Sequence, residues 1–256
     1  MAPKKRRLPV HSPAAPRSAL TKEVLAGVAD GEARVAAAWL ARGAAGVARA
    51  AEVAAERART LANAALAREP PSRPVACREG CSYCCHVKIL VVAPEAVRLA
   101  EHLRAALPAA AFDRLVERVR ETDALTRGLS RRARAERRVP CPLLDEAGAC
   151  AAYEARPIVC GGWTSLDVEA CARSFDDADA PSAPVFAPGY EVASGVLAGL
   201  GKGCFDAGLD GAPLELVAAL RIALEAPNAA ASYAAGRPVF APARDAEWQS
   251  SHPKRA

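Results

Sequence analysis

Apolar residues recur at helical spacing over much of this chain, and short runs of proline and glycine separate them. From Ser18 to Arg68 the sequence is rich in alanine, and its larger apolar residues keep a helical period. These are Leu20, Val24, Leu25, Val28, Val35 and Leu40. Gly43 and Gly46 predict a break into two helices, and PPSRP at 70–74 ends the second because proline cannot continue a helix.

The same kind of pattern returns further along the chain. The stretch VKILVV at 87–92 predicts a short extended segment, and residues 93–107 and 111–129 predict two amphipathic helices. Pro94 suits the first turn of the earlier one. Residues 190–226 again predict helix, and no repeated alternation of strands and helices is visible. The pattern therefore predicts a mainly α fold.

Composition refines this fold without naming a function. Apolar residues make up 52% of the chain but aromatic residues only 5%, so the core must be built from small side chains. The formal charge of +5 permits an anionic partner and does not require one. The basic start, MAPKKRRLPV, is followed by prolines and not by the apolar run of a secretory signal.

No stretch reaches the length of about 18 uninterrupted apolar residues that a membrane span needs. We therefore expect a cytoplasmic protein with no membrane partner. Thiols stay reduced in the cytoplasm, so the nine cysteines favour metal or redox chemistry over a disulfide framework.

Eight of these cysteines fall into two groups of four. The first group lies in CREGCSYCCH as Cys77, Cys81, Cys84 and Cys85, and the second comprises Cys141, Cys150, Cys160 and Cys171. Thiolates that bind zinc must converge to about 2.3 Å from the ion. Adjacent side chains point in different directions, so Cys84 and Cys85 seldom bind one ion. This favours ligands shared between the two groups, in two sites or in one cluster.

An alternative interpretation treats the first group as one face of a helix, with cysteine acting as a small apolar residue. Gly80, the nearby prolines and the second group of cysteines weigh against it. We therefore predict that all eight cysteines bind metal, with helices packed around a loop-rich cysteine and metal core. Zinc and iron both suit thiolates, and an iron–sulfur cluster is a third option.

Residues near the cysteines suggest supporting roles. Several thiolates on one ion leave a negative charge, for which Arg156 is the best counter-cation and Lys88 a weaker one. An ordinary surface ion pair is the alternative for Arg156. His86 could replace one cysteine as a ligand. Cys204 stands apart and is typical of a buried structural thiol.

Arginines are concentrated between residues 127 and 138. They could form a nucleic-acid-binding face together with the KKRR run of the tail. No aromatic residues are interleaved for base stacking, so we favour a solvated helical surface or linker and expect no nucleic-acid partner. A protein partner cannot be deduced from the sequence.

Composition and cysteine spacing together divide the chain into five segments. We predict a disordered basic tail, an alanine-rich helical arm, a cysteine-cluster metal-binding domain, a linker and a C-terminal helical segment. Their bounds are 1–17, 18–70, 75–175, 176–189 and 190–245.

The cysteine motifs resemble a known family. C-x3-C-x2-C-C at 77–85, CPLLDEAGAC at 141–150 and YEARPIVC at 153–160 are similar in order and spacing to the YkgJ-like cysteine-cluster (CxxCxxCC) family. The resemblance implies a bacterial domain that chelates zinc or iron. The family usually has arginine after the third motif's cysteine, where this chain has Gly161, which leaves Arg156 as the main cation.

Two further resemblances bear on function. Flagellin lysine-N-methylases are similar in these motifs, which raises methyl transfer as a possibility. The C-x3-C-x2-C spacing also resembles the cluster loop of radical S-adenosylmethionine enzymes, but the repeated strand–helix units of those enzymes are missing here. The leading hypothesis is a metal-binding protein, and the alternative is an iron–sulfur-dependent enzyme of redox or methyl-transfer type.

Overall fold

The computed structural model describes residues 20–251, so the predicted tail at 1–17 lies outside the described residues. Within that part the chain forms eleven α-helices and one two-stranded sheet, which confirms the prediction of a mainly α fold. None of the described helices is long and apolar enough to cross a membrane.

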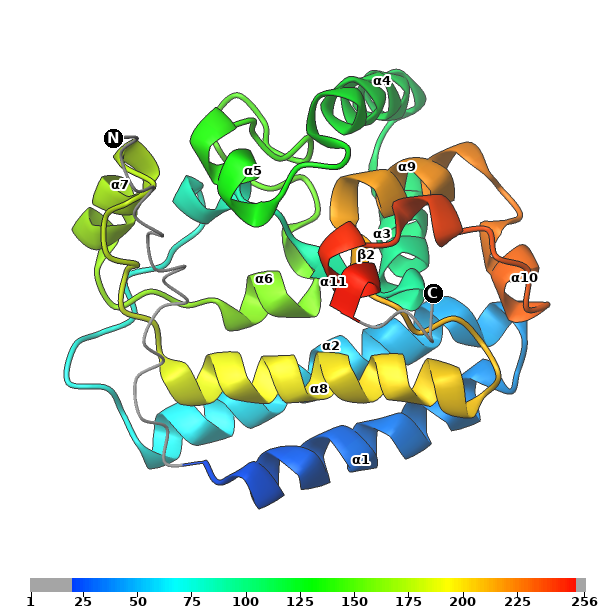
Figure 1. Cartoon of the computed structure of the whole chain (residues 1–256), viewed down its shortest axis with the longest axis horizontal. Coiled ribbons are helices and arrows are strands. Elements are labelled where there is room, and N and C mark those ends of the chain that lie inside the picture. The colour runs from blue at the N-terminus through cyan, green and yellow to red at the C-terminus, as the bar shows by residue number, and fades with distance from the viewer. Residues whose placement is uncertain (1–19, 252–256) are drawn as a thin grey trace, which may run out of the picture.

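Three long helices form a layer along one side of the molecule. They are α1 (Lys22–Leu40), α2 (Ala44–Arg68) and α8 (Ala187–Asp206), and α8 packs on both of the others. The break predicted near Gly43 falls between α1 and α2, and the helix ends before the proline run as expected. Figure 1 shows these helices side by side, with the remaining elements on one side of them.

Small residues let α8 approach α1 closely. A Cβ atom added to Gly199 would lie 2.4 Å from the Ala29 carbonyl oxygen, and one added to Gly203 would lie 2.7 Å from that of Ala33. Neither position can hold a side chain without a backbone shift. The alanine-rich composition is thus used for close helix packing, and Ala33 and Ala36 are fully buried between the helices.

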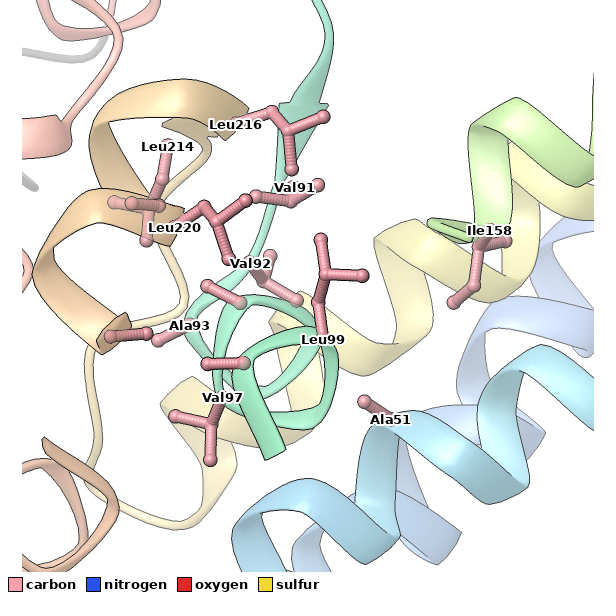
Figure 2. Close-up of a cluster of buried hydrophobic side chains, with 14 of the residues drawn as sticks. Ala51, Val91, Val92, Ala93, Val97, Leu99, Ile158, Leu214, Leu216 and Leu220 are labelled. Carbon is pink, nitrogen blue, oxygen red and sulfur yellow. The ribbon is translucent and has the colours of Figure 1, made fainter. Parts of the chain in front are cut away.

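A second group of elements is built around α3 (Ala93–Ala106). It includes α4 (Ala109–Thr126), α9 (Leu216–Glu225) and α10 (Ala229–Ala234). Strand β1 (Leu90–Val91) pairs antiparallel with β2 (Leu214–Glu215), with Leu90 opposite Glu215. Figure 2 shows Val91, Val92 and Leu99 pointing toward Leu216 and Leu220 in a shared core.

The cysteine segments contain only short elements. They are η1 (Tyr83–His86), η2 (Tyr153–Ala155), α6 (Ile158–Gly162) and α7 (Val168–Asp176). The arginine-rich stretch forms α5 (Arg131–Arg137), and η3 (Ala241–Ala243) and α11 (Ala246–Ser251) end the described chain. Helix α6 packs on α8, and α7 packs on η1. Helix α6, which carries Cys160, therefore lies directly on the helical layer (Figure 1).

Candidate metal centre

A cavity of about 1520 Å³ lies between the cysteine segments and α8. All eight cysteines of the two groups line it: Cys77, Cys81, Cys84, Cys85, Cys141, Cys150, Cys160 and Cys171. The ninth, Cys204, is fully buried and does not line this cavity. All nine cysteines carry free thiols.

The motif CPLLDEAGAC folds into a tight hairpin. Leu144 and Cys150 form an antiparallel bridge, and the Asp145 carboxylate accepts hydrogen bonds from the N–H groups of Ala147 and Ala149 at 2.9 and 2.8 Å. Gly148 has φ of 77°, a left-handed conformation that glycine adopts without strain. The hairpin thereby brings Cys141 and Cys150 to one end, and Asp145 is accounted for as a turn residue.

Hydrogen bonds tie the first cysteine segment to the later ones. The Cys141 N–H donates to the Cys85 carbonyl at 2.8 Å, and the Ala76 N–H donates to the Ser165 carbonyl at the same distance. The Ser165 N–H also donates to Cys77 Sγ at 3.1 Å. An N–H group aimed at sulfur stabilises the thiolate form, which is the form that binds metal.

The cysteines are grouped in space differently from their order in the sequence. The titration of Cys77 is influenced by Cys81, Cys84 and Cys171, so Cys171 lies with the first group. The charges that act on Cys160 include those of Cys141, Cys150 and Cys84. Cys84 therefore adjoins both sets, and its neighbour Cys85 hydrogen-bonds to it through the side chain.

The sulfurs surround the cavity without meeting at a point. Among residues 20–251, no three Cys, His, Asp or Glu side chains are arranged closely enough to hold an ion. The donor chemistry fits zinc or iron, since the donors are thiols on the wall of one cavity. Metal binding here requires the short loops that carry these thiols to move them closer together.

Burial favours the protonated form of several of these thiols, because it raises their pKa. It raises the pKa of Cys141 to about 11, against an opposing effect of the Leu143 N–H group. Burial also raises the pKa of Cys160, and nearby thiols raise it further. The pKa of Cys84 is raised first by the hydrogen bond to Cys85 and then by burial. A metal ion would have to displace these protons, so binding should weaken as the pH falls.

Arg156 lies beside the thiols without a carboxylate partner. Its charge acts on both Cys84 and Cys150, and its guanidinium stacks 4.3 Å from the centre of the Tyr153 ring. No carboxylate in residues 20–251 lies within 4 Å of it. Lys88, by contrast, is buried and paired with Asp245, so its charge is already compensated.

Two other residues considered from the sequence have packing roles in this structure. His86 Nδ1 lies 3.1 Å from the Ser82 carbonyl oxygen, and the ring packs edge-on against Phe175. Cys204 packs in the core, where its thiol hydrogen-bonds with the Tyr233 hydroxyl. Neither interaction indicates a ligand.

Glu95 positions the segment that carries Cys160. One carboxylate oxygen accepts a hydrogen bond from the Ile158 N–H at 2.9 Å, and the other accepts one from the Val92 N–H at 3.2 Å. The side chain is 3% exposed, so it fixes the first turn of α6 against the start of α3. Nothing in the sequence singles out Glu95, because a glutamate in a helix's first turn usually faces solvent.

Comparison with known families agrees with this geometry. Residues 76–172 match the model of a family described as "CxxCxxCC: Putative zinc- or iron-chelating domain". We call this matched segment, residues 76–172, the CxxCxxCC domain. The match confirms the resemblance seen in the cysteine motifs. All eight cysteines of the two groups lie within the matched residues. Searches of curated proteins and of solved structures returned no match to the chain.

Proposed function

We propose that the CxxCxxCC domain chelates zinc or iron through the thiolates of its eight cysteines. The observation that carries this proposal is their gathering around one cavity from segments that span residues 77–171. The family assignment supports the same chemistry. We further propose two ligand sets that meet at Cys84 and Cys85, one with Cys77, Cys81 and Cys171 and one with Cys141, Cys150 and Cys160.

The ligand sets follow from the local contacts. Cys171 is electrostatically coupled to Cys81 and Cys84, whereas Cys141 and Cys150 share a hairpin and lie near Cys160. We place the adjacent pair where the two sets meet because Cys84 adjoins both sets and Cys85 hydrogen-bonds to it through the side chain. The bound metal would compensate several thiolate charges at once, with Arg156 contributing from the side.

Anaerobic purification followed by metal analysis and absorption spectroscopy tests the proposal. Stoichiometric zinc in a colourless protein, or iron in a coloured one, is the expected result. Cys141→Ser should lower the metal content, and Cys204→Ala is the matched control because the ninth cysteine lies outside the cavity. Wild-type protein without zinc or iron under these conditions, or Cys141→Ser with full metal content, would contradict the proposal.

The size of the cavity favours a second candidate function, that of an iron–sulfur-dependent enzyme. A volume of about 1520 Å³ exceeds that of common ligand pockets, which hold about 300–1000 Å³. The wall continues past the cysteines along one face of α8, through Tyr190, Ser194, Leu197 and Gly201. Redox or methyl-transfer chemistry would need such space for a substrate beside the cluster.

Spectroscopy distinguishes the two candidates. Broad visible absorption together with acid-labile sulfide and iron would support the cluster and with it the enzyme. A colourless zinc protein would favour chelation alone. Broad absorption that persists in Cys84→Ser and Cys160→Ser variants would contradict ligation by these cysteines.

A further inference from the structure

Arg134 is the exception in the arginine-rich stretch. Helix α5 starts after Ser130, whose hydroxyl accepts a hydrogen bond from the Ala133 N–H. Arg131 and Arg137 on this helix are exposed, as a solvated surface requires. Arg134 is only 2% exposed and lines the cavity that holds the eight cysteines.

The buried guanidinium has unused donors. Nε and Nη1 of Arg134 have no hydrogen-bond partner, and within residues 20–251 no carboxylate lies within 4 Å. Burying a charge without a partner strongly destabilises the folded state. A buried cation that the described protein leaves unpaired calls for an anion.

Two ionisable groups act electrostatically on the Arg134 guanidinium, and they are Glu215 and Cys141. The Glu215 carboxylate accepts a hydrogen bond from the Ala218 N–H at 2.8 Å and forms neither a hydrogen bond nor an ion pair with Nε or Nη1 of Arg134. Cys141 Sγ is the other group, and it accepts a hydrogen bond from the Leu143 N–H. A thiolate at Cys141 would supply the anion that Arg134 lacks.

We propose that Arg134 is the buried counter-cation of the metal–thiolate centre at Cys141. This inference rests on the proposed function, because Cys141 carries a negative charge only when a metal holds it as thiolate. Arg134 would then act at Cys141, and Arg156 at Cys84 and Cys150. Arg134 acts through Cys141 and is a positioning residue.

The proposal predicts effects of opposite sign in the metal-free and metal-loaded protein. Arg134→Met removes an unpaired buried charge from the reduced, metal-free protein, so its melting temperature should rise or stay unchanged. The same change removes the counter-cation of the loaded centre. Zinc affinity, measured by competition with a chromophoric chelator under anaerobic conditions, should fall by about 10–100-fold, as for other outer partners of metal ligands.

Matched variants isolate the charge of Arg134. Arg134→Lys keeps a cation and should recover most of the zinc affinity. Arg131→Met changes an exposed arginine of the same helix that lines the same cavity, and should keep the affinity within about threefold. In a Cys141→Ser background, Arg134→Met should have little further effect, because the two side chains act as one unit.

Several results would overturn the proposal. The proposal fails if Arg134→Met binds zinc as tightly as the wild type does. It also fails if Arg131→Met loses as much zinc affinity as Arg134→Met. A metal-free Arg134→Met protein that fails to fold would show that the arginine stabilises the fold without metal. Failure of the wild type to bind zinc or iron is a separate result, which rejects the proposed function before any arginine variant is compared.

Discussion

Different interactions hold together two regions of the molecule. One is the helical layer of α1, α2 and α8, and the other is the pair of cysteine segments at 77–86 and 141–171. In the layer, glycine and alanine bring helix backbones into contact, and Ala33, Ala36 and Gly199 leave no space for a ligand. In the cysteine segments, short turns are joined by single hydrogen bonds such as Cys141 to Cys85. Packing alone can hold the first region, whereas the short cysteine segments at 77–86 and 141–171 bury few large apolar side chains.

This difference shows where a metal would act. Close helix packing is insensitive to what fills the cavity, but protonated thiols around it contribute little cohesion. Structural zinc supplies about 10–16 kcal/mol in small domains that fold around it. The cysteine segments at 77–86 and 141–171 should therefore depend on metal more strongly than the helical layer does.

Metal removal should give the largest effect and should be confined to one region. At free zinc a thousandfold above the dissociation constant, binding stabilises the bound state by about 4 kcal/mol. Amides of the hairpin at 141–150 and of residues 77–86 should then exchange about a thousandfold faster after chelation. Hydrogen-exchange mass spectrometry of loaded and chelated protein, both reduced, measures this.

The same experiment contains its control. Amides in the middle of α1 and α8 should keep their protection after chelation. Equal loss of protection in both regions would show that the layer and the cysteine segments unfold as one unit, and the comparison between them would no longer hold.

Gly199→Ala should weaken the layer itself. The added Cβ would lie 2.4 Å from the Ala29 carbonyl oxygen and 2.6 Å from Glu32 Cβ, so the helices must separate. We expect a loss of about 2–3 kcal/mol in the free energy of unfolding, measured in urea. Gly27→Ala is the matched control on α1, because nothing lies within 4 Å of its added Cβ. That variant should gain about 0.5–1 kcal/mol from helix propensity.

Glu95→Ala should break the junction between the two regions. It leaves the N–H groups of Ile158 and Val92 buried without acceptors, which costs about 1–3 kcal/mol for each. We expect a loss of about 2 kcal/mol in urea unfolding, together with faster amide exchange in α6. Glu101→Ala, an exposed position on the same helix, should change stability by less than about 0.5 kcal/mol. Equal effects of the two variants would contradict the role given to Glu95.

The sequence predicted the two regions unequally, and the reasons are physical. Helices with a clear apolar period, such as α1, α3 and α4, begin and end close to their predicted positions. The pairing of Leu90 with Glu215 was not predictable, because two-residue strands far apart in the chain carry no local signal. The short helices α6 and α7 lie in a stretch whose glycines and prolines predicted mainly loops.

The sequence predicted the cysteine thiols of the candidate site but not the residues that surround them. Cysteine spacing carries a chemical meaning, so all eight cavity-lining thiols were named from the sequence, and their role as ligands stays a prediction. Arg134 was placed on a solvated surface because five other arginines surround it in the chain. Its burial depends on elements that meet only in the folded protein. The supporting contacts of Ser165 and Glu95 depend on backbone positions that side-chain patterns do not specify.

Glu32 offers the smallest and most specific test of the layer. Its side chain is fully buried, both carboxylate oxygens lack hydrogen bonds, and Arg57 Nε lies 3.7 Å away. Burial raises the pKa of Glu32 to about 7, against an opposing effect of Arg57. The folded state therefore binds a proton more tightly than the unfolded state, and stability should fall as the pH rises from about 4.5 to about 7.

Glu32→Gln removes this titration from the layer. At pH 8 it should stabilise the protein by about 1–2 kcal/mol, since a buried carboxylate that accepts no hydrogen bond is replaced by a neutral amide. The gain should shrink as the pH falls toward 4.5, because the carboxyl of the folded wild type is then protonated and neutral. Urea unfolding at several pH values measures this difference, with Glu56→Gln on the exposed face of α2 as the control. A gain that does not change with pH would mean that packing around Glu32, and not its charge, limits the stability of the helical layer.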